Sequence, residues 1–277
     1  MTDTARELGL GPRRTPGRRL LRTALITVLL GYGLICLLMA IGQRHFPYFP
    51  RPVDPTTRQL LSEQALAIDG VEAWLVHPDA PGPLLLYCGG NAEDAADAAL
   101  RWHGREHSVL CWNYPGYGAS PGAPSEEAII AAGGRVLDWI ERSLPERRLI
   151  IVGRSLGSAV AVALAGQRRP AGLVLVSPMD SVRAVAARHH PLLPVCLLLQ
   201  DTWRSDQRAA DLDLPLLVLL GTADRTVPPS HSQALAALWP GLVTVVELPG
   251  SSHNDTAAHP DYWPAIATFI GALEGAG

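Results

Sequence analysis

The sequence predicts an α/β fold in which helices cover both faces of a mostly parallel central sheet. From residue 71 onward, short apolar runs alternate with longer stretches of helical periodicity, and this alternation is typical of parallel strands joined by right-handed crossovers. Several of the runs are apolar at every position, as expected for strands buried on both faces. The chain has 277 residues, of which 48% are hydrophobic and 18% charged, so it can bury one large core.

The apolar runs and helical stretches alternate through one expected domain, residues 69–275. We expect strands at 71–76, 84–88, 108–112, 149–152, 172–176, 216–220 and 243–248. We expect helices at 92–102, 125–142, 156–168, 231–238 and 261–273. No internal repeat divides this region, so the sequence favours a single domain.

The N-terminal part of the chain has a different composition. Residues 23–42 are twenty residues without a charge, about 30 Å long as a helix, which matches the hydrocarbon thickness of a bilayer. The tail before it, residues 1–22, is basic, so we expect a single-pass anchor with a cytoplasmic N-terminus and the domain on the non-cytoplasmic side. A cleaved signal peptide is the alternative, although the run is long for one and no clear A-x-A site follows. Residues 43–68, rich in proline and aromatic residues, are expected to be a linker.

The charge distribution argues against broad nucleic-acid binding. Residues 1–44 carry seven Arg and two acidic residues, a net charge of +5, whereas residues 45–277 carry sixteen Arg and twenty-four acidic residues, a net charge of −8. The expected domain therefore has no positive excess with which to neutralise phosphates. Four cysteines are too few for a disulfide scaffold, and we expect Cys88 and Cys111 to be packed thiols on neighbouring strands.

The strongest chemical signal is the segment Gly153-Arg154-Ser155-Leu156-Gly157, which lies between an apolar run and a helical stretch of small residues. A serine on a tight turn from strand to helix exposes its hydroxyl, and flanking glycines let the strand and the helix approach each other. Ser155 is therefore a candidate nucleophile. A serine that only caps a helix is the structural alternative.

A nucleophilic serine needs a base, and the base needs an acid to orient it. Asp224 and His253 each follow an apolar run, in the order along the chain that this fold requires. Both lie where strands end, at the edge from which Ser155 also emerges, so we expect a Ser155, His253 and Asp224 triad. Asp180 is an alternative acid and His259 an alternative base.

An acyl-transfer site also needs hydrogen-bond donors for the oxyanion of its tetrahedral intermediate. The backbone N–H of Leu156, directly after the nucleophile, is one expected donor. The second is the N–H of Asn91, in a loop where Gly89 and Gly90 end one strand before the next helix. A tight turn with an Asn cap is the alternative. The histidines show no HExxH motif and the cysteines no CxxC pair, so we expect no metal and no other cofactor.

The motifs GGNAED, NYPGYGASPGAPSEE, GRSLG, SPMDS, GTADRTVP and GSSHNDT follow one another in the order found in the α/β-hydrolase superfamily. Over residues 68–273 the chain most resembles the Bem46-like branch, whose members often carry an N-terminal membrane anchor. The resemblance implies a serine hydrolase with Ser155 as nucleophile, Asp224 as orienting acid and His253 as base. It also implies that the loop 113–122 shapes the mouth of the site. The family usually has His-Gly-Asn where this chain has Gly-Gly-Asn, a difference that affects the shape of the pocket more than its chemistry.

The expected function is that of a membrane-anchored serine hydrolase that cleaves carboxylic esters or thioesters of acyl or lipid-like substrates through an acyl-enzyme. A serine peptidase or amidase on the same fold is the first alternative, because the same triad cleaves amides. A catalytically inactive, membrane-tethered binding or scaffold protein is the second. The apolar segment 189–203 is either a lid over the site, which would suit lipid-like substrates, or an ordinary packed insertion.

Overall fold

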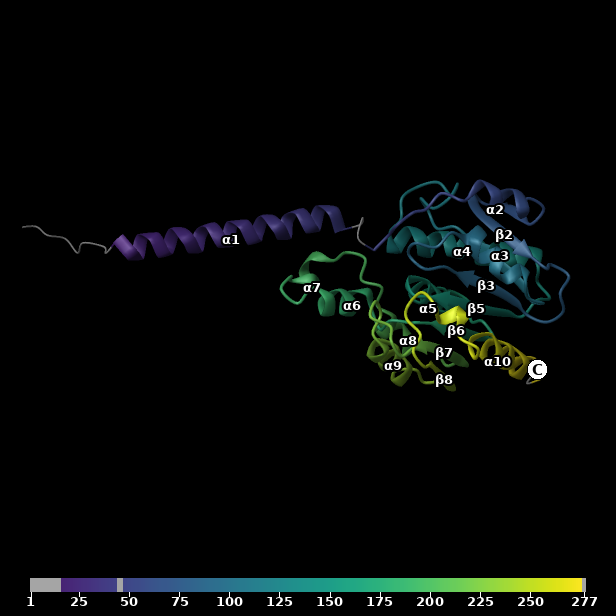
Figure 1. Ribbon diagram of the computed structural model, residues 1–277. Helices are drawn as coiled ribbons and strands as arrows, with labels where there is room; N and C mark the ends of the chain where they lie inside the picture. Colours follow the sequence, from purple (N-terminus) through teal and green to yellow (C-terminus); the bar gives the residue numbers. More distant parts are fainter. Residues whose placement is uncertain (1–15, 44–46, 276–277) are drawn as a thin grey trace, which may run out of the picture. The chain divides into compact units, whose positions relative to one another are not determined.

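The computed structural model describes residues 16–43 and 47–275, and the chain divides into two compact units after Gly42 (Figure 1). The first unit contains α1 (Pro16–Gly42), a helix of 27 residues. Its stretch from Gly17 to Gly42 is long and apolar enough to cross a membrane, and none of its most apolar part is buried inside the protein. The uncharged run of the sequence therefore lies within one continuous helix.

Within the described residues, the second unit is built on a sheet of eight strands in the order β1-β2-β4-β3-β5-β6-β7-β8 (Figure 1). The strands are β1 (Ala65–Ile68), β2 (Val71–Val76), β3 (Leu84–Cys88), β4 (Ser108–Trp112), β5 (Leu149–Arg154), β6 (Gly172–Val176), β7 (Leu216–Gly221) and β8 (Val243–Leu248). The pairs β1–β2 and β2–β4 are antiparallel, and all other neighbours are parallel. Every residue of β3, β4 and β6 is buried, because helices cover both faces. The predicted mostly parallel sheet is confirmed.

Helices form a layer on each face of the sheet. One face is covered by α3 (Ala95–His103) and α10 (Tyr262–Gly275), and the other by α4 (Glu126–Ser143), α5 (Leu156–Gln167), α8 (Ser205–Ala209) and α9 (Pro229–Ala237). On the first face, Trp102 and Ile266 join the buried side chains of the strands. On the second, Ile129, Val160 and Leu235 do the same. Each face therefore has its own core, as an α/β fold requires.

The segment before β2 belongs to the folded unit, whereas its composition predicted a linker over 43–68. It includes α2 (Pro55–Leu60) and β1, and every residue of β1 pairs with β2. Tyr48 is only 2% exposed, and its hydroxyl donates to Asp201 (3.0 Å) and accepts from the indole N–H of Trp203 (3.0 Å). These partners lie more than 150 residues later in the chain, so local composition carries no sign of them.

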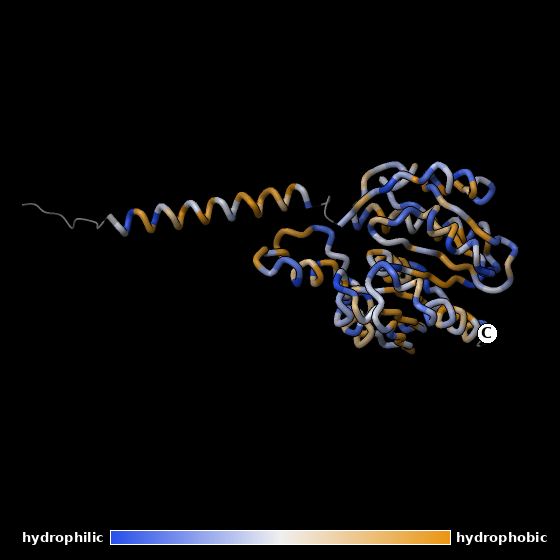
Figure 2. Tube along the Cα trace, in the orientation of Figure 1, coloured by the Kyte–Doolittle hydropathy of each residue, from blue (hydrophilic) through white to orange (hydrophobic). Residues whose placement is uncertain are grey.

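Residues 182–203, which we call the α6–α7 excursion, leave the sheet between β6 and β7. The excursion contains α6 (Val182–His189) and α7 (Val195–Leu198). An isolated bridge between Ser181 and Arg204 closes its base. The excursion projects beyond the rest of the second unit in Figure 1, and Figure 2 shows hydrophobic residues along its tip. Because the side chain of Leu197 is 82% exposed, this segment is not an ordinary packed insertion.

Candidate active site

Ser155 occupies the turn between β5 and α5. Its backbone has φ 53° and ψ −118°, a strained conformation for a residue that carries a side chain. The Ser155 N–H donates to the carbonyl of Val176 (2.9 Å), and the Ser155 carbonyl accepts from the hydroxyl of Ser158 (2.6 Å). These bonds to β6 and α5 fix the turn and leave the Ser155 hydroxyl at the carboxyl end of β5.

The glycines on either side of Ser155 are required by close packing. A Cβ atom added to Gly153 would overlap the carbonyl oxygen of Gly157, the second residue of α5. A Cβ atom added to Gly157 would overlap the carbonyl oxygen of Cys88 at the end of β3. Both obstacles are backbone atoms, which cannot move aside as a flexible side chain can. The G-x-S-x-G spacing therefore lets the start of α5 sit directly against β3 and β5.

Two loops bring an imidazole and a carboxylate to Ser155. His253 lies in the loop after β8, with its Nε2 2.9 Å from the Ser155 Oγ. Its Nδ1 is 2.7 Å from Oδ2 of Asp224, which follows β7. The structure thus brings together the three residues that the sequence selected, although Ser155 and His253 are 98 residues apart.

Both carboxylate oxygens of Asp224 are engaged. Oδ2 faces His253, and Oδ1 accepts from the backbone N–H groups of Thr226 and Val227, each at 2.9 Å. Burial raises the pKa of the Asp224 carboxyl, but the hydrogen bond and the electrostatic attraction of His253 and the N–H of Val227 together lower it by more. The net pKa lies below the ordinary value, so Asp224 is ionised at neutral pH. An ionised Asp224 accepts from Nδ1–H of His253, which leaves Nε2 to accept from the serine hydroxyl.

The two alternative residues have other partners. Oδ1 of Asp180 lies 2.8 Å from Nδ1 of His231, so this carboxylate orients a different imidazole. His259 accepts at Nδ1 from the backbone N–H of Asp261 (3.2 Å). Neither side chain makes a hydrogen bond to Ser155 in the described part of the chain. The geometry therefore favours Asp224 and His253.

The two expected oxyanion donors come from the start of α5 and from the loop after β3. Leu156 is the first residue of α5, so its N–H has no carbonyl one turn earlier in the helix to bind. In the loop after β3, the N–H of Gly90 is bound by the carboxylate of Glu93 (2.8 Å). The carbonyl of Asn91 accepts from the N–H of Phe49 (3.0 Å) and the hydroxyl of Tyr117 (2.5 Å). The peptide group between Gly90 and Asn91 carries the donor N–H. The peptide groups before and after it are both hydrogen-bonded, so this N–H is held in one orientation.

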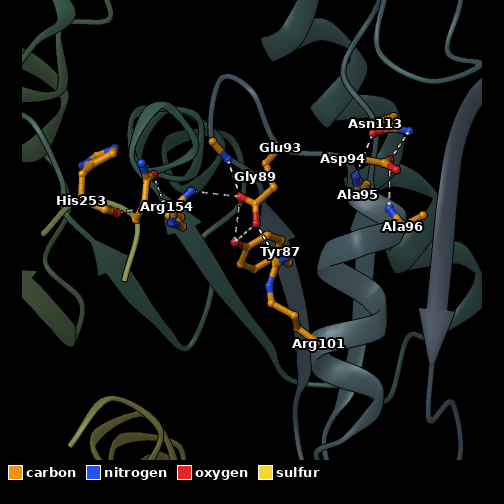
Figure 3. Close-up of polar contacts among 12 residues, drawn as sticks. Tyr87, Gly89, Glu93, Asp94, Ala95, Ala96, Arg101, Asn113, Arg154 and His253 are labelled. Carbon is orange, nitrogen blue, oxygen red and sulfur yellow. Dashed lines mark hydrogen bonds and ion pairs between the residues drawn. The ribbon is translucent and has the colours of Figure 1, made fainter. Parts of the chain in front are cut away.

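The loop 113–122 supports the loop after β3, residues 89–94, which we call the oxyanion loop because it carries the expected donor Asn91. The hydroxyl of Tyr114 donates to the carbonyl of Gly89 (2.7 Å), and Tyr117 donates to Asn91. Asn113 accepts at Oδ1 from the N–H of Ala95 (3.0 Å), at the start of α3 (Figure 3). The resemblance implied that this loop shapes the mouth of the site, and its contribution is through these hydrogen bonds.

Arg154 and Glu93 link the loops of the site, a role that the sequence did not predict. The guanidinium of Arg154 donates to the carbonyl of His253 (2.9 Å) and to the side chain of Asn254 (3.1 Å). It also lies 3.7 Å from the carboxylate of Glu93, which in turn is paired with Arg101 (Figure 3). One side chain thus connects the nucleophile turn, the histidine loop and the oxyanion loop. Its position inside the G-x-S-x-G motif was the only available signal.

A cleft of about 460 Å³ opens onto Ser155 and His253. Its wall mixes aromatic and charged side chains, including those of Trp263, Arg101 and Glu93. None of the described residues of the α6–α7 excursion lines this cleft, so the excursion is not a lid closed over the serine.

The described cysteines and acidic side chains do not form a metal centre. Among the residues that the structure describes, no group of three or more His, Cys, Asp or Glu side chains is placed to hold a metal ion. Cys88 and Cys111 are free and buried on the neighbouring strands β3 and β4. Burial raises the pKa of the Cys88 thiol to about 12, so it stays protonated and is a poor nucleophile.

Comparisons with known proteins identify relatives of this chain and structures with a similar fold. A family model described as the alpha/beta hydrolase fold matches residues 83–191. The uncharacterized protein Rv2307c of Mycobacterium tuberculosis is 37% identical over 251 residues, which cover 86% of this chain and 89% of that protein. The uncharacterized membrane protein YNL320W of Saccharomyces cerevisiae is 33% identical over 171 residues, 59% of this chain and 60% of that protein.

A solved structure extends the likeness to three dimensions. The esterase Pf2001 of Pyrococcus furiosus superposes with a TM-score of 0.62, covering 83% of this chain and 98% of that one. The sequence identity over this match is 15%, so the likeness concerns the fold.

Proposed function

Because the chain belongs to the α/β-hydrolase family, we propose that it is a serine hydrolase that cleaves carboxylic esters or thioesters of acyl or lipid-like groups. The observation that carries the proposal is the continuous hydrogen-bonded chain from Ser155 Oγ through His253 to Asp224. The strained backbone of Ser155 supports it, because such strain is typical of a nucleophile turn and has no use in a helix cap.

In the proposed first step, the Ser155 Oγ attacks the carbonyl carbon of the substrate. Nε2 of His253 accepts the hydroxyl proton, and the ionised Asp224 stabilises the imidazolium that forms. The N–H groups of Leu156 and Asn91 donate to the oxyanion of the tetrahedral intermediate. His253 then gives the proton to the departing alcohol or thiol, and the acyl group remains on Ser155.

In the second step, water attacks the acyl-enzyme while His253 accepts one of its protons. The tetrahedral intermediate collapses, the acid leaves, and the proton returns to Ser155. Arg154 takes no part in proton transfer. Its bonds to the carbonyl of His253 and toward Glu93 support the proposal, because they hold the base and the oxyanion loop at a fixed separation.

We further propose that α1 anchors the protein in a membrane as a single-pass helix. The basic residues before the apolar run would keep the N-terminus in the cytoplasm and place the catalytic unit on the other side. Support comes from the length and apolar character of α1 and from the yeast relative that is named a membrane protein. A reporter enzyme fused to the C-terminus tests this topology, and cytoplasmic activity of the reporter would reverse the assigned orientation.

A fluorophosphonate probe tests the catalytic assignment, because it reacts covalently with an activated serine. We expect the full chain to be labelled, and Ser155→Ala to lose labelling and about 10⁴-fold or more of its ester turnover. Ser232→Ala is a matched control, because this buried serine only donates to the carbonyl of Pro178 (2.7 Å). Labelling that persists in Ser155→Ala would refute the assignment.

A substrate series then tests the bond that is cleaved. Nitrophenyl esters of increasing chain length, a thioester and an anilide of the same acyl group are compared under identical conditions. We expect the ester and the thioester to be hydrolysed and the anilide to react far more slowly. Preferential cleavage of the anilide would instead identify an amidase or a peptidase.

A further inference from the structure

The tip of the α6–α7 excursion is strongly apolar and strongly exposed. Leu192 and Leu197 are 85% and 82% exposed, more than any other large apolar side chain in the described part of the chain. Residues 191–199 contain no charged residue. Exposure of this degree in a segment with this composition marks a surface that is covered by an apolar partner.

The end of the excursion is held next to the residue that follows α1. The N–H of Gln200 donates to the side-chain oxygen of Gln43 (2.6 Å). Gln43 is joined by a peptide bond to Gly42, the last residue of α1. Gln200 is therefore hydrogen-bonded to the residue that directly follows α1, whatever direction that helix takes. If α1 spans a bilayer, this end of the excursion lies near the surface of that bilayer.

A second contact reinforces the first. The Tyr48 hydroxyl is bonded to Asp201 and to Trp203, both at the base of the excursion. Five residues after Gln43, the chain has travelled at most about 18 Å. Gln43 and Tyr48, both in the segment that follows α1, therefore make hydrogen bonds to the C-terminal end of the excursion.

The charges near the tip suit a lipid surface. From Val182 to Gln200 the chain has no acidic residue, whereas Arg183, Arg188 and two histidines lie on the α6 side of the apolar tip. Arg188 is exposed. Basic side chains that flank an apolar stretch can bind headgroup phosphates while the apolar side chains enter the acyl region.

The segment that leaves α1 also reaches the proposed active site. The N–H of Phe49 donates to the carbonyl of Asn91 in the oxyanion loop. The loop of the proposed oxyanion hole is therefore hydrogen-bonded to a residue only seven positions after the end of α1. A chain of seven residues spans at most about 25 Å. A substrate that leaves the bilayer beside the excursion has a short path to Ser155.

We propose that the α6–α7 excursion inserts Leu192 and Leu197 into the bilayer that α1 spans, and that the enzyme takes its acyl esters from this bilayer. The substrate class is then a long-chain ester or thioester whose acyl chain is embedded in the lipid. This proposal rests on the membrane anchoring and the hydrolase activity proposed above. The position of Gln43 favours the lipid bilayer as the partner, because Gln43 directly follows the helix that is proposed to span it.

Depth-dependent fluorescence quenching tests the insertion without using activity. The full chain, with Cys36→Ser, is labelled with a nitrobenzoxadiazole dye at the exposed Cys196, while Cys88 and Cys111 are buried and protected. It is reconstituted into phosphatidylcholine vesicles containing about one fifth phosphatidylglycerol, with or without nitroxide-labelled lipids. We expect strong quenching by a nitroxide attached near the headgroup end of the acyl chain.

The control variant carries Cys196→Ser and Leu242→Cys, so that the dye is attached in the loop before β8. Leu242 is 76% exposed, and a dye at this position should show little quenching. Equal quenching at both positions would overturn the proposal.

Activity on two substrates tests delivery from the bilayer. We expect the double variant L192D/L197D to hydrolyse a vesicle-embedded long-chain ester about tenfold more slowly than the parent, and a water-soluble butyrate ester at an unchanged rate. The variant L238D/L242D places the same charges on two other exposed leucines and should match the parent on both substrates. An equal loss on both substrates, or no loss on either, would contradict the proposal. If the parent hydrolyses neither ester, the proposed function fails, and the quenching result still decides whether the excursion inserts.

Discussion

α5 and the tip of the α6–α7 excursion are both apolar, yet one is buried along most of its length and the other is exposed. In α5, residues 156–165 are all buried between the sheet and the helices of one face. In the excursion, Leu192 and Leu197 are exposed at the surface of the second unit. An apolar sequence therefore shows that a segment needs a partner other than water, but does not show which partner it has.

The residue types of the two segments distinguish them. α5 is rich in Gly, Ala and Ser, which let its backbone come close to β3 and β5. The excursion tip consists mostly of Leu, interrupted by Pro191 and Pro194, which precede α7, a helix of only four residues. Small residues allow close packing against a rigid surface such as a sheet, whereas projecting leucines suit a fluid surface such as lipid. Four substitutions test this difference, beginning with the one of largest expected effect.

Gly157→Ala should have the largest effect, because the added methyl group would meet the carbonyl of Cys88. We expect a loss of at least about 4 kcal/mol in the free energy of unfolding, together with loss of activity. Urea unfolding of the detergent-solubilised chain measures the change. Gly166→Ala, near the other end of α5, is the matched control, because an added Cβ there meets no atom within 4 Å. Similar stabilities of the two variants would show that α5 is not closely packed at its start.

Leu164→Ala should come next. Leu164 is fully buried in α5, and its side chain fills the space beside Gly133 of α4. Removing it leaves a cavity in the core, so we expect a loss of about 3 kcal/mol in the free energy of unfolding. A shift in the midpoint of thermal unfolding reports the loss. A change below about 1 kcal/mol would mean that the helices on this face close over the gap.

Tyr48→Phe should have an intermediate effect that is confined to the excursion. It removes the hydroxyl that serves both Asp201 and Trp203 and leaves buried polar atoms without a partner. We expect a loss of about 2 kcal/mol and faster hydrogen exchange in residues 195–205. Exchange in α5 should not change. Uniform acceleration throughout the second unit would argue against a local role for this contact.

Leu197→Ala should have the smallest effect on stability. Its side chain is exposed, so its removal in detergent should change the free energy of unfolding by no more than about 0.5 kcal/mol. The comparison with Leu164→Ala is direct, since both replace a leucine by alanine in an apolar helix. A loss as large as that of Leu164→Ala would mean that Leu197 is covered by protein and would leave no reason for a lipid partner.

Most of the central sheet could be predicted because several of its strands are apolar at nearly every position. The expected runs at 84–88, 108–112 and 172–176 coincide with β3, β4 and β6. β1 could not be predicted, because it is a short, half-exposed strand at the edge of the sheet and its pattern is weak. The helices of the excursion were also missed, since α6 and α7 have only eight and four residues, which is too short to establish a helical period in the sequence.

The meeting of Ser155, His253 and Asp224 could be predicted because the nucleophile turn is a local motif. Its partners follow at the ends of later parallel strands, and the fold places those ends at one edge. Arg154 and Glu93 could not be assigned in the same way. They are 61 residues apart, and a pairing between an arginine and a glutamate leaves no spacing pattern in a sequence.

The hydrogen bond between Phe49 and Asn91 determines where the chain can be truncated without disturbing the proposed active site. A shortened protein that began at residue 69, where the sequence pattern starts, would lack β1 and the two residues that support the oxyanion loop and the excursion. Such a protein would be a poor test of the proposed function even if it folded, because a weak activity would reflect the missing support and not the chemistry proposed for Ser155. The boundary that preserves these contacts lies at Gly42, directly after α1.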